Sequence, residues 1–90
     1  MSDRLRWIEE SFPDEALNLA VGFQDAIVGV QDHCPGRPAL VVYDTLLCIE
    51  ILMRDGMTED DAGDYFTFNV SGSWVGVNTP IFMTPYEGER

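Results

Sequence analysis

The carboxylates between residues 55 and 64 are the side chains whose type and spacing most directly suggest chemistry. Five acidic residues occur in this stretch with no basic residue among them: Asp55, Glu59, Asp60, Asp61 and Asp64. Paired carboxylates can act as general acid and base, but this requires a pocket that shifts their pKa values. Because a chain of 90 residues encloses little space, we interpret Asp60 and Asp61 as surface residues and expect the protein not to be an enzyme.

These five residues, which we call the acidic patch, allow two interpretations. In the first, the patch imitates the phosphate rows of DNA and occupies the groove of a nucleic-acid-binding protein. In the second, it is the solvated start of a helix, where the helix dipole favours negative charge. The composition bears on this choice, because sixteen acidic residues face five arginines, lysine is absent and the net charge is −11. Such a surface repels nucleic acid and anionic membranes and attracts basic proteins.

Other reactive residue types are few. Asp32, His33 and Cys34 are adjacent, and Cys48 follows later. A structural zinc site would show paired ligands such as C-x2-C together with a second pair, and neighbouring side chains in one loop seldom align as a Cys–His nucleophile. Residues 72–76 lack the lysine of a phosphate-binding loop. We therefore predict no metal, no cofactor and no catalytic residue.

The first half of the chain contains two short, β-branched runs. Ala26–Val30 and Ala39–Tyr43 are typical of buried strands, and the Pro- and Gly-rich loop between them predicts a hairpin. Residues 79–83 are expected to be extended, with Pro80 at a sheet edge or outside the sheet. A short helix is predicted for Arg4–Glu10.

Two adjoining helices are predicted at about 45–54 and 58–71. Asp44 and Thr58 are suitable N-caps, and Gly56 can end the first helix with a positive φ. A pair between Glu50 and Arg54 is expected on the exposed side. Within the second helix the spacing assigns Tyr65 and Phe66 mostly to the core. Phe68 falls off the inward stripe and is predicted to contact either a partner or a second copy of the chain.

These elements predict an α+β fold, with a small two- to three-stranded antiparallel sheet packed against the two helices. The chain is expected to form a single domain over 1–90, with residues 1–15 loosely attached and residues 85–90 mobile. Met1–Arg4 lacks a signal peptide's apolar run, no stretch approaches the ~18 apolar residues of a membrane span, and the two cysteines make no disulfide framework. These features favour a cytoplasmic location.

The C-terminal half also carries an ordered series of motifs: Tyr43-Asp44, Ile49–Met53, Gly56–Thr58, Ala62, Tyr65-Phe66, Phe68–Val70, Gly72, Trp74–Gly76 and Thr79–Phe82. Together with Asp25–Val30, this series resembles a family of small uncharacterised acidic proteins of tailed bacteriophages and prophages. The resemblance implies a phage or prophage source and a compact α+β domain. It brings no established activity, so it transfers no catalytic residue.

The charge and the resemblance lead to one main functional expectation. The protein would be a phage-encoded inhibitor of a basic, nucleic-acid-handling host protein, such as a CRISPR complex or a restriction nuclease, with the acidic patch and Phe68 as its contact surface. One alternative is a sponge for a nucleotide signal. It would use a pocket at an oligomer interface, with Trp74 or Tyr65 stacking on the base and Arg37 and Arg54 as candidates to offset its charge. Another is a homodimer or larger homo-oligomer with a structural or assembly role.

Overall fold

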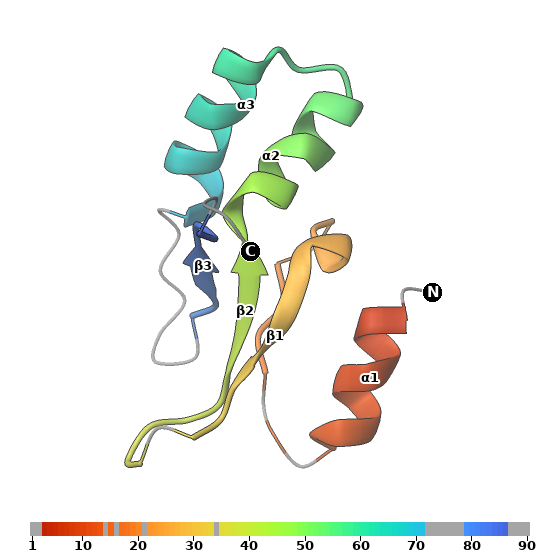
Figure 1. Ribbon diagram of the computed structural model, residues 1–90, viewed down its shortest axis with the longest axis vertical. Coiled ribbons are helices and arrows are strands. Elements are labelled where there is room, and N and C mark those ends of the chain that lie inside the picture. Colours follow the sequence, from red (N-terminus) through yellow and green to blue (C-terminus); the bar gives the residue numbers. More distant parts are fainter. Residues whose placement is uncertain are drawn as a thin grey trace.

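A three-stranded sheet forms the centre of the protein, and a pair of helices extends from one end of it (Figure 1). The computed structural model describes residues 3–13, 15, 17–20, 22–33, 35–71 and 79–86. Strand β1 (Ile27–Gln31) pairs antiparallel with β2 (Leu40–Asp44), and β2 pairs in parallel with β3 (Ile81–Met83). The α+β class and the predicted hairpin are both confirmed.

The direction of β3 differs from the sequence prediction of an antiparallel sheet. Residues Val42 to Asp44 lie opposite Ile81 to Met83 in parallel register, so the sheet is mixed. Two helices stand between β2 and β3 in the chain, and a parallel pair requires a long crossover connection of this kind. Because β2 is central, β3 lies at an edge, which is one of the two positions that Pro80 indicated.

The helices begin and end where local capping signals place them. Helix α2 (Thr45–Arg54) starts at Asp44, whose carboxylate accepts hydrogen bonds from the N–H groups of Leu46 (2.8 Å) and Leu47 (3.2 Å). Helix α3 (Glu59–Tyr65) starts at Thr58, whose hydroxyl accepts a bond of 3.2 Å from the N–H of Asp61. Between the helices, Gly56 has a φ of 113°, a conformation that favours glycine.

The predicted helix over residues 58–71 changes its winding halfway. It is α-helical to Tyr65 and continues as the π-helical turn η2 (Phe66–Ser71). The hydroxyl of Thr67 donates a hydrogen bond of 2.9 Å to the carbonyl oxygen of Gly63. That carbonyl also accepts from the backbone N–H of Phe66, so the side-chain bond is an additional one close to the point where the helical winding changes.

The core lies where the sheet meets the two helices. The ring of Tyr43 stacks on Phe82 (centroids 5.3 Å apart, planes at 25°), and Phe82 meets Phe66 edge to face (5.3 Å, 85°). These aromatic contacts tie β2, β3 and η2 together. The buried cluster consists of Ile8, Phe23, Ala26, Ile27, Val41, Tyr43, Cys48, Leu52, Ala62 and Phe66.

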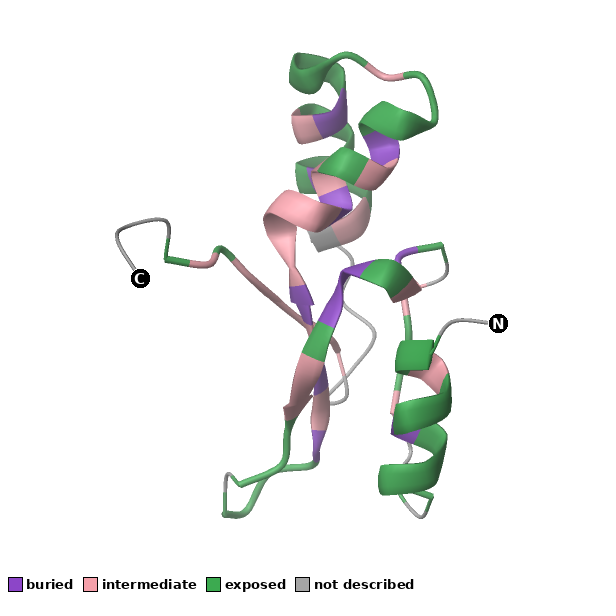
Figure 2. Cartoon of the chain, turned by 45° about the vertical axis from the view of Figure 1, so that its right-hand side comes forward, coloured by how far each residue is buried: buried purple, intermediate pink, exposed green. Residues whose placement is uncertain are grey.

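Helix α1 (Asp3–Ser11) lies beside β1 and contributes Ile8 to this core (Figures 1 and 2). Its only buried residue is Ile8, whereas Trp7 is 45% exposed. A short 3-10 helix, η1 (Gln24–Ala26), leads into β1. In the described part of the chain, no helix has the length and apolar character needed to cross a bilayer.

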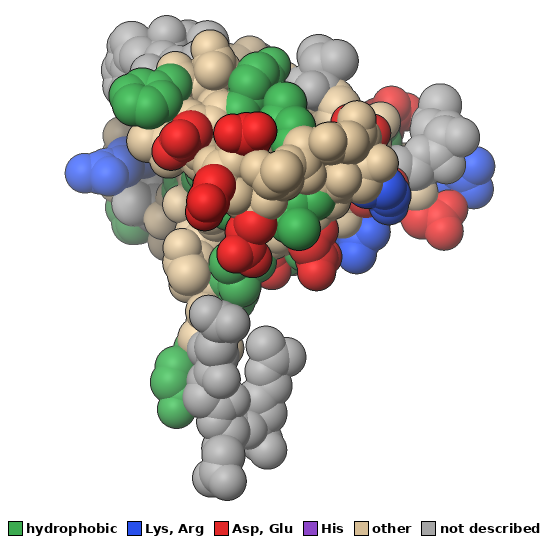
Figure 3. All heavy atoms as spheres, turned by 90° about the horizontal axis from the view of Figure 1, so that it is seen from above, with side chains coloured by type: hydrophobic (Ala, Val, Ile, Leu, Met, Phe, Trp, Pro, Cys, Tyr) green, Lys and Arg blue, Asp and Glu red, His purple; other side chains and the backbone are tan. Residues whose placement is uncertain are grey.

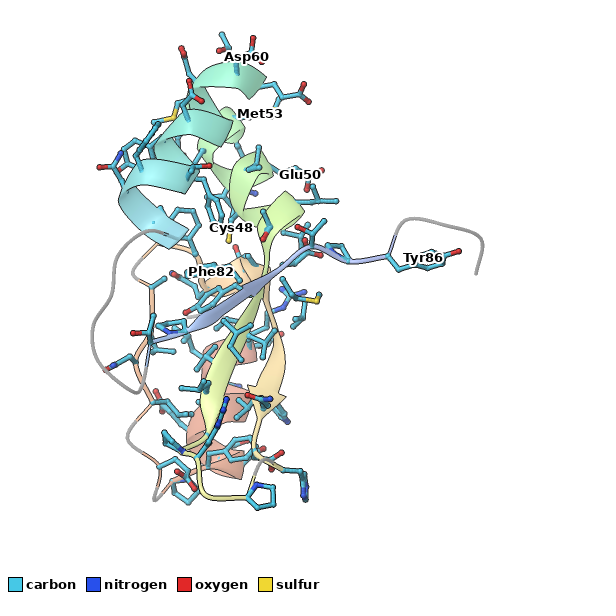
Figure 4. All side chains as sticks on the ribbon, turned by 90° about the vertical axis from the view of Figure 1, so that its left-hand side faces the viewer. Cys48, Glu50, Met53, Asp60, Phe82 and Tyr86 are labelled. Atoms are coloured by element: carbon cyan, nitrogen blue, oxygen red, sulfur yellow. The ribbon has the colours of Figure 1, made fainter. Side chains whose placement is uncertain are left out.

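Several sequence predictions concern residues outside those that the structure describes. These are the chain turn around Trp74, the loop residue Cys34 and the last residues, 87–90, of the tail expected to be mobile. The described part of that tail ends in Tyr86, which is 77% exposed and lies on a segment that points away from the body of the protein (Figure 4).

Candidate functional site

The acidic patch occupies the end of the helix pair that lies farthest from the sheet. Asp55 follows α2, Glu59, Asp60 and Asp61 form the first turn of α3, and Asp64 lies one turn later. All five side chains are exposed. Figure 3 looks down on this end and shows acidic side chains gathered on it, with hydrophobic side chains among them and the basic ones toward the rim.

The packing of α3 decides which of its residues face the solvent. Ala62 (0% exposed) and Phe66 (5%) point into the core. Because α3 advances about 100° per residue, Asp60 and Asp64 share the opposite side, one turn apart. The structure therefore places Asp60 and Asp64 on one exposed side of α3, with Glu59 and Asp61 on its flanks.

Aromatic and apolar side chains extend this face. Phe68 is 78% exposed, which confirms that it lies off the inward stripe. Tyr65 is 43% exposed, so its assignment to the core was wrong. The reason is the rotation of α3, because a helix that points Ala62 and Phe66 inward turns the residue before Phe66 toward its flank. The i, i+3 spacing between Ala62 and Tyr65 had led to the core assignment.

No basic side chain neutralises the patch within the described part of the chain. The contact between a basic and an acidic side chain found there joins His33 to Asp32, with 3.7 Å between Nε2 and Oδ1, in the loop between β1 and β2, and it is an ion pair only when the imidazole is protonated. The predicted pair between Glu50 and Arg54 does not form within 4.0 Å, since these two described residues make no ion pair. Among the described residues, therefore, no basic side chain forms an ion pair with these five exposed carboxylates.

Of the residues considered for metal or nucleophilic chemistry, Cys34 lies outside the part of the chain that the structure describes. Among the described residues no three His, Cys, Asp or Glu side chains form a metal-binding group. Cys48 is fully buried, and this burial, followed by the negative charge of Asp44, raises the pKa of its thiol to about 12. A thiol with this pKa stays protonated at neutral pH and is a poor nucleophile.

Hollows on the surface involve other residues. One of about 220 Å³ lies between α1 and the segment before β1, lined by Leu5, Leu19, Ala20, Gly22, Gln24 and Tyr43. Another of about 300 Å³ lies on α2, lined by Asp25, Leu47, Glu50, Ile51 and Arg54. Arg37 is in the β1–β2 loop and Arg54 is the last residue of α2, and this loop and the helix pair lie at opposite ends of the molecule (Figure 1). One chain therefore does not bring both arginines to a single site for a nucleotide.

The chain matches no protein-family model, no curated protein and no solved structure at a significant level. The resemblance to phage and prophage proteins therefore stays a prediction, and the function has to be argued from the geometry and charge of the chain itself.

Proposed function

We propose that the protein binds a basic surface of a nucleic-acid-handling protein and blocks it, using the acidic patch together with Phe68. The observation that carries this proposal is a combination of two features. Five exposed carboxylates form no ion pair with any described residue, and Phe68, on the helical segment that carries four of them, is 78% exposed.

The charge supplies the attraction and the orientation. A net charge of −11 accelerates encounter with a positively charged protein, and a cluster of one sign directs which face arrives first. The same charge repels DNA and RNA, whose phosphates must themselves be neutralised by a binding protein. A groove that accepts nucleic acid is the complementary surface, because it is lined with the basic side chains that the patch lacks.

The exposed rings supply the affinity that charge alone does not. Charged contacts at the rim of an interface contribute mainly to rate and specificity, whereas buried aromatic side chains dominate the binding energy. Phe68 and Tyr65 lie next to the carboxylates on the same helical segment. A phage or prophage source, which the motif series implies, fits a role as an inhibitor of a host defence or nucleic-acid enzyme.

Affinity capture from bacterial lysate tests the proposal when two charge-reversed variants are compared. Asp60→Arg with Asp64→Arg alters the patch. Glu9→Arg with Glu10→Arg makes the same change in net charge on the exposed side of α1. We expect a basic, nucleic-acid-binding protein to be captured at low salt and released at high salt, by the wild type and the α1 variant but not by the patch variant.

A second measurement connects capture with inhibition. The captured protein should lose its affinity for DNA or RNA when the wild-type chain is added, and should keep it when the patch variant is added. Equal capture by both variants, or equal loss in both, would show that only the total charge matters and would contradict a defined binding face.

A further inference from the structure

A hollow of about 310 Å³ lies between the second half of α1 and the irregular segment that follows it. Its apolar walls come from Ile8, Phe12, Pro13, Leu17 and Leu19. Ile8 is buried, Phe12 and Leu17 are half-buried, and Leu19 is 45% exposed. We call this the α1 hollow. Since a cavity of about 150 Å³ can hold benzene, the α1 hollow has room for a ring that carries a substituent.

The charged residues in the lining of the α1 hollow are both glutamates, Glu9 and Glu15. Their side chains are exposed, and neither forms an ion pair with a described residue. Arg6, one turn before Glu9 on α1, makes no ion pair with it either. The two hollows described above differ, because the one on α2 includes Arg54 and the one beside Tyr43 has no charged residue. The α1 hollow therefore presents negative charge next to an apolar surface.

The side chains that line the α1 hollow can accept hydrogen bonds but cannot donate them. Apart from the two carboxylates they are all apolar. The backbone of this segment adds little, because Pro13 has no N–H group. The N–H groups of Phe12 and Glu15 already donate to the carbonyl oxygens of Ile8 (2.9 Å) and Phe12 (3.3 Å). An anionic ligand would find no side-chain donor here, whereas a cation would find two carboxylates.

The ring of Phe12 adds a second feature that favours a cation. It meets the ring of Trp7 edge to face, with the centroids 5.7 Å apart and the planes at 82°, so its orientation against α1 is supported. The face of an aromatic ring attracts positive charge, and ammonium groups with alkyl substituents are commonly recognised in this way. The ring, the aliphatic walls and the carboxylates together fit an ammonium group with apolar substituents.

We propose that the α1 hollow binds a small organic cation, in which an ammonium group carries apolar substituents. The positive group would lie near Glu9 and Glu15, and the substituents would contact Phe12, Leu17 and Leu19. Helix α1 lies beside β1, whereas the acidic patch is at the far end of the helix pair (Figure 1). The site is therefore separate from the surface proposed to bind a basic protein.

Amide NMR spectra of the full chain, titrated with two probes, test the site. Phenyltrimethylammonium and benzenesulfonate are similar in size and shape but opposite in charge. We expect the cation to shift the signals of residues that line the α1 hollow, with saturation and a dissociation constant of about 1 mM or lower. The anion should cause no such shifts. Shifts that do not saturate, that spread over all acidic surfaces or that are equal for both probes would overturn the proposal.

A pair of neutralised variants with the same net charge separates the site from general attraction to the chain. Glu9→Gln with Glu15→Gln removes both charges of the α1 hollow and should weaken phenyltrimethylammonium binding by about tenfold or more. Asp25→Asn with Glu50→Gln removes the two carboxylates of the α2 hollow, which has a similar volume of about 300 Å³, and should change binding by less than about twofold. All four side chains are exposed, so circular dichroism should show both variants folded. Equal weakening in both would reject the α1 hollow as the site.

Two further variants test the ring and the independence of the site. Phe12→Leu keeps an apolar wall but removes the aromatic face, and should weaken the cation by about two- to fivefold. Unchanged binding would contradict recognition by the ring. The charge-reversed α1 variant, Glu9→Arg with Glu10→Arg, should lose the cation and still capture the basic protein. Cation binding that survives this reversal would overturn the proposal, whatever the result of the capture experiment.

Discussion

The hydroxyl of Tyr43 accepts a hydrogen bond of 2.8 Å from the backbone N–H of Ala20, which lies 23 positions earlier in the chain. Tyr43 is fully buried in the central strand, and Ala20 belongs to the irregular segment that precedes β1. This bond joins the segment that follows α1 to the core of the sheet.

Removal of this hydroxyl should destabilise the fold without changing the packing of the ring. In Tyr43→Phe the N–H of Ala20 loses its partner, and we expect the free energy of unfolding to fall by roughly 1 to 3 kcal/mol. Urea denaturation followed by circular dichroism measures this change. Tyr65→Phe is the control, because Tyr65 is 43% exposed and its change should stay within about 0.5 kcal/mol. Equal effects of the two substitutions would argue against a structural role for the Tyr43 bond.

Cys48 should make the protein sensitive to alkaline pH. Its pKa is raised by burial and by Asp44 from the ordinary value of 9.0 to about 12. Between these values the unfolded chain has lost the thiol proton and the folded chain has kept it, so stability falls as pH rises, by at most about 1.4 kcal/mol per pH unit. Burial also raises the pKa of Tyr43 above 10.0, which acts in the same direction.

Unfolding curves measured at a series of pH values above 9 check this slope. Cys48→Ala removes the titrating group, so its stability should decline less steeply with pH, although the lost sulfur lowers its stability at every pH. An identical slope in the variant and the wild type would show that Cys48 does not carry the effect.

Two phenylalanines two positions apart should behave differently. Phe66 is 5% exposed and Phe68 is 78% exposed. Phe66→Ala should cost about 3 to 5 kcal/mol, because it removes a buried ring and leaves a cavity. Phe68→Ala should leave thermal unfolding nearly unchanged and weaken capture of the basic partner. A large loss of stability in Phe68→Ala would show that this ring has a packing role instead.

Substitution by alanine should change the stability of the protein in opposite directions at two glycines. Gly56 has a φ of 113°, so Gly56→Ala introduces strain and should destabilise the protein by about 1 kcal/mol or more. Gly63 lies within α3, and an added Cβ there meets no atom within 4 Å. Gly63→Ala should therefore stabilise the helix by roughly 0.5 to 1 kcal/mol. Thermal melts of the two variants compare them directly, and shifts of the same sign would be inconsistent with these backbone geometries.

Most signals that act over a few residues were read correctly from the sequence, although the expected pair between Glu50 and Arg54 does not form. The caps at Asp44 and Thr58 and the positive φ of Gly56 each depend on one side chain, or on its absence, next to the backbone that it serves. The hairpin strands and the position of the acidic patch on the surface follow from short apolar runs and from the solvation of charge. These features can be predicted without knowing which segments pack against each other in the core.

Features that depend on distant parts of the chain needed the tertiary structure. The parallel pairing of β3 with β2 and the bond between Tyr43 and Ala20 each join segments that are far apart in sequence. The exposure of Tyr65 follows from the rotation of α3 against the core. Helical spacing predicts which residues of α3 face the core only to within about one position. The packing of Ala62 and Phe66 fixed the rotation of α3 about its own axis. By itself the sequence determined the elements, their caps and the charge of the surface. The packing between elements decided which neighbours meet, because long-range contacts select one among the arrangements that local preferences allow.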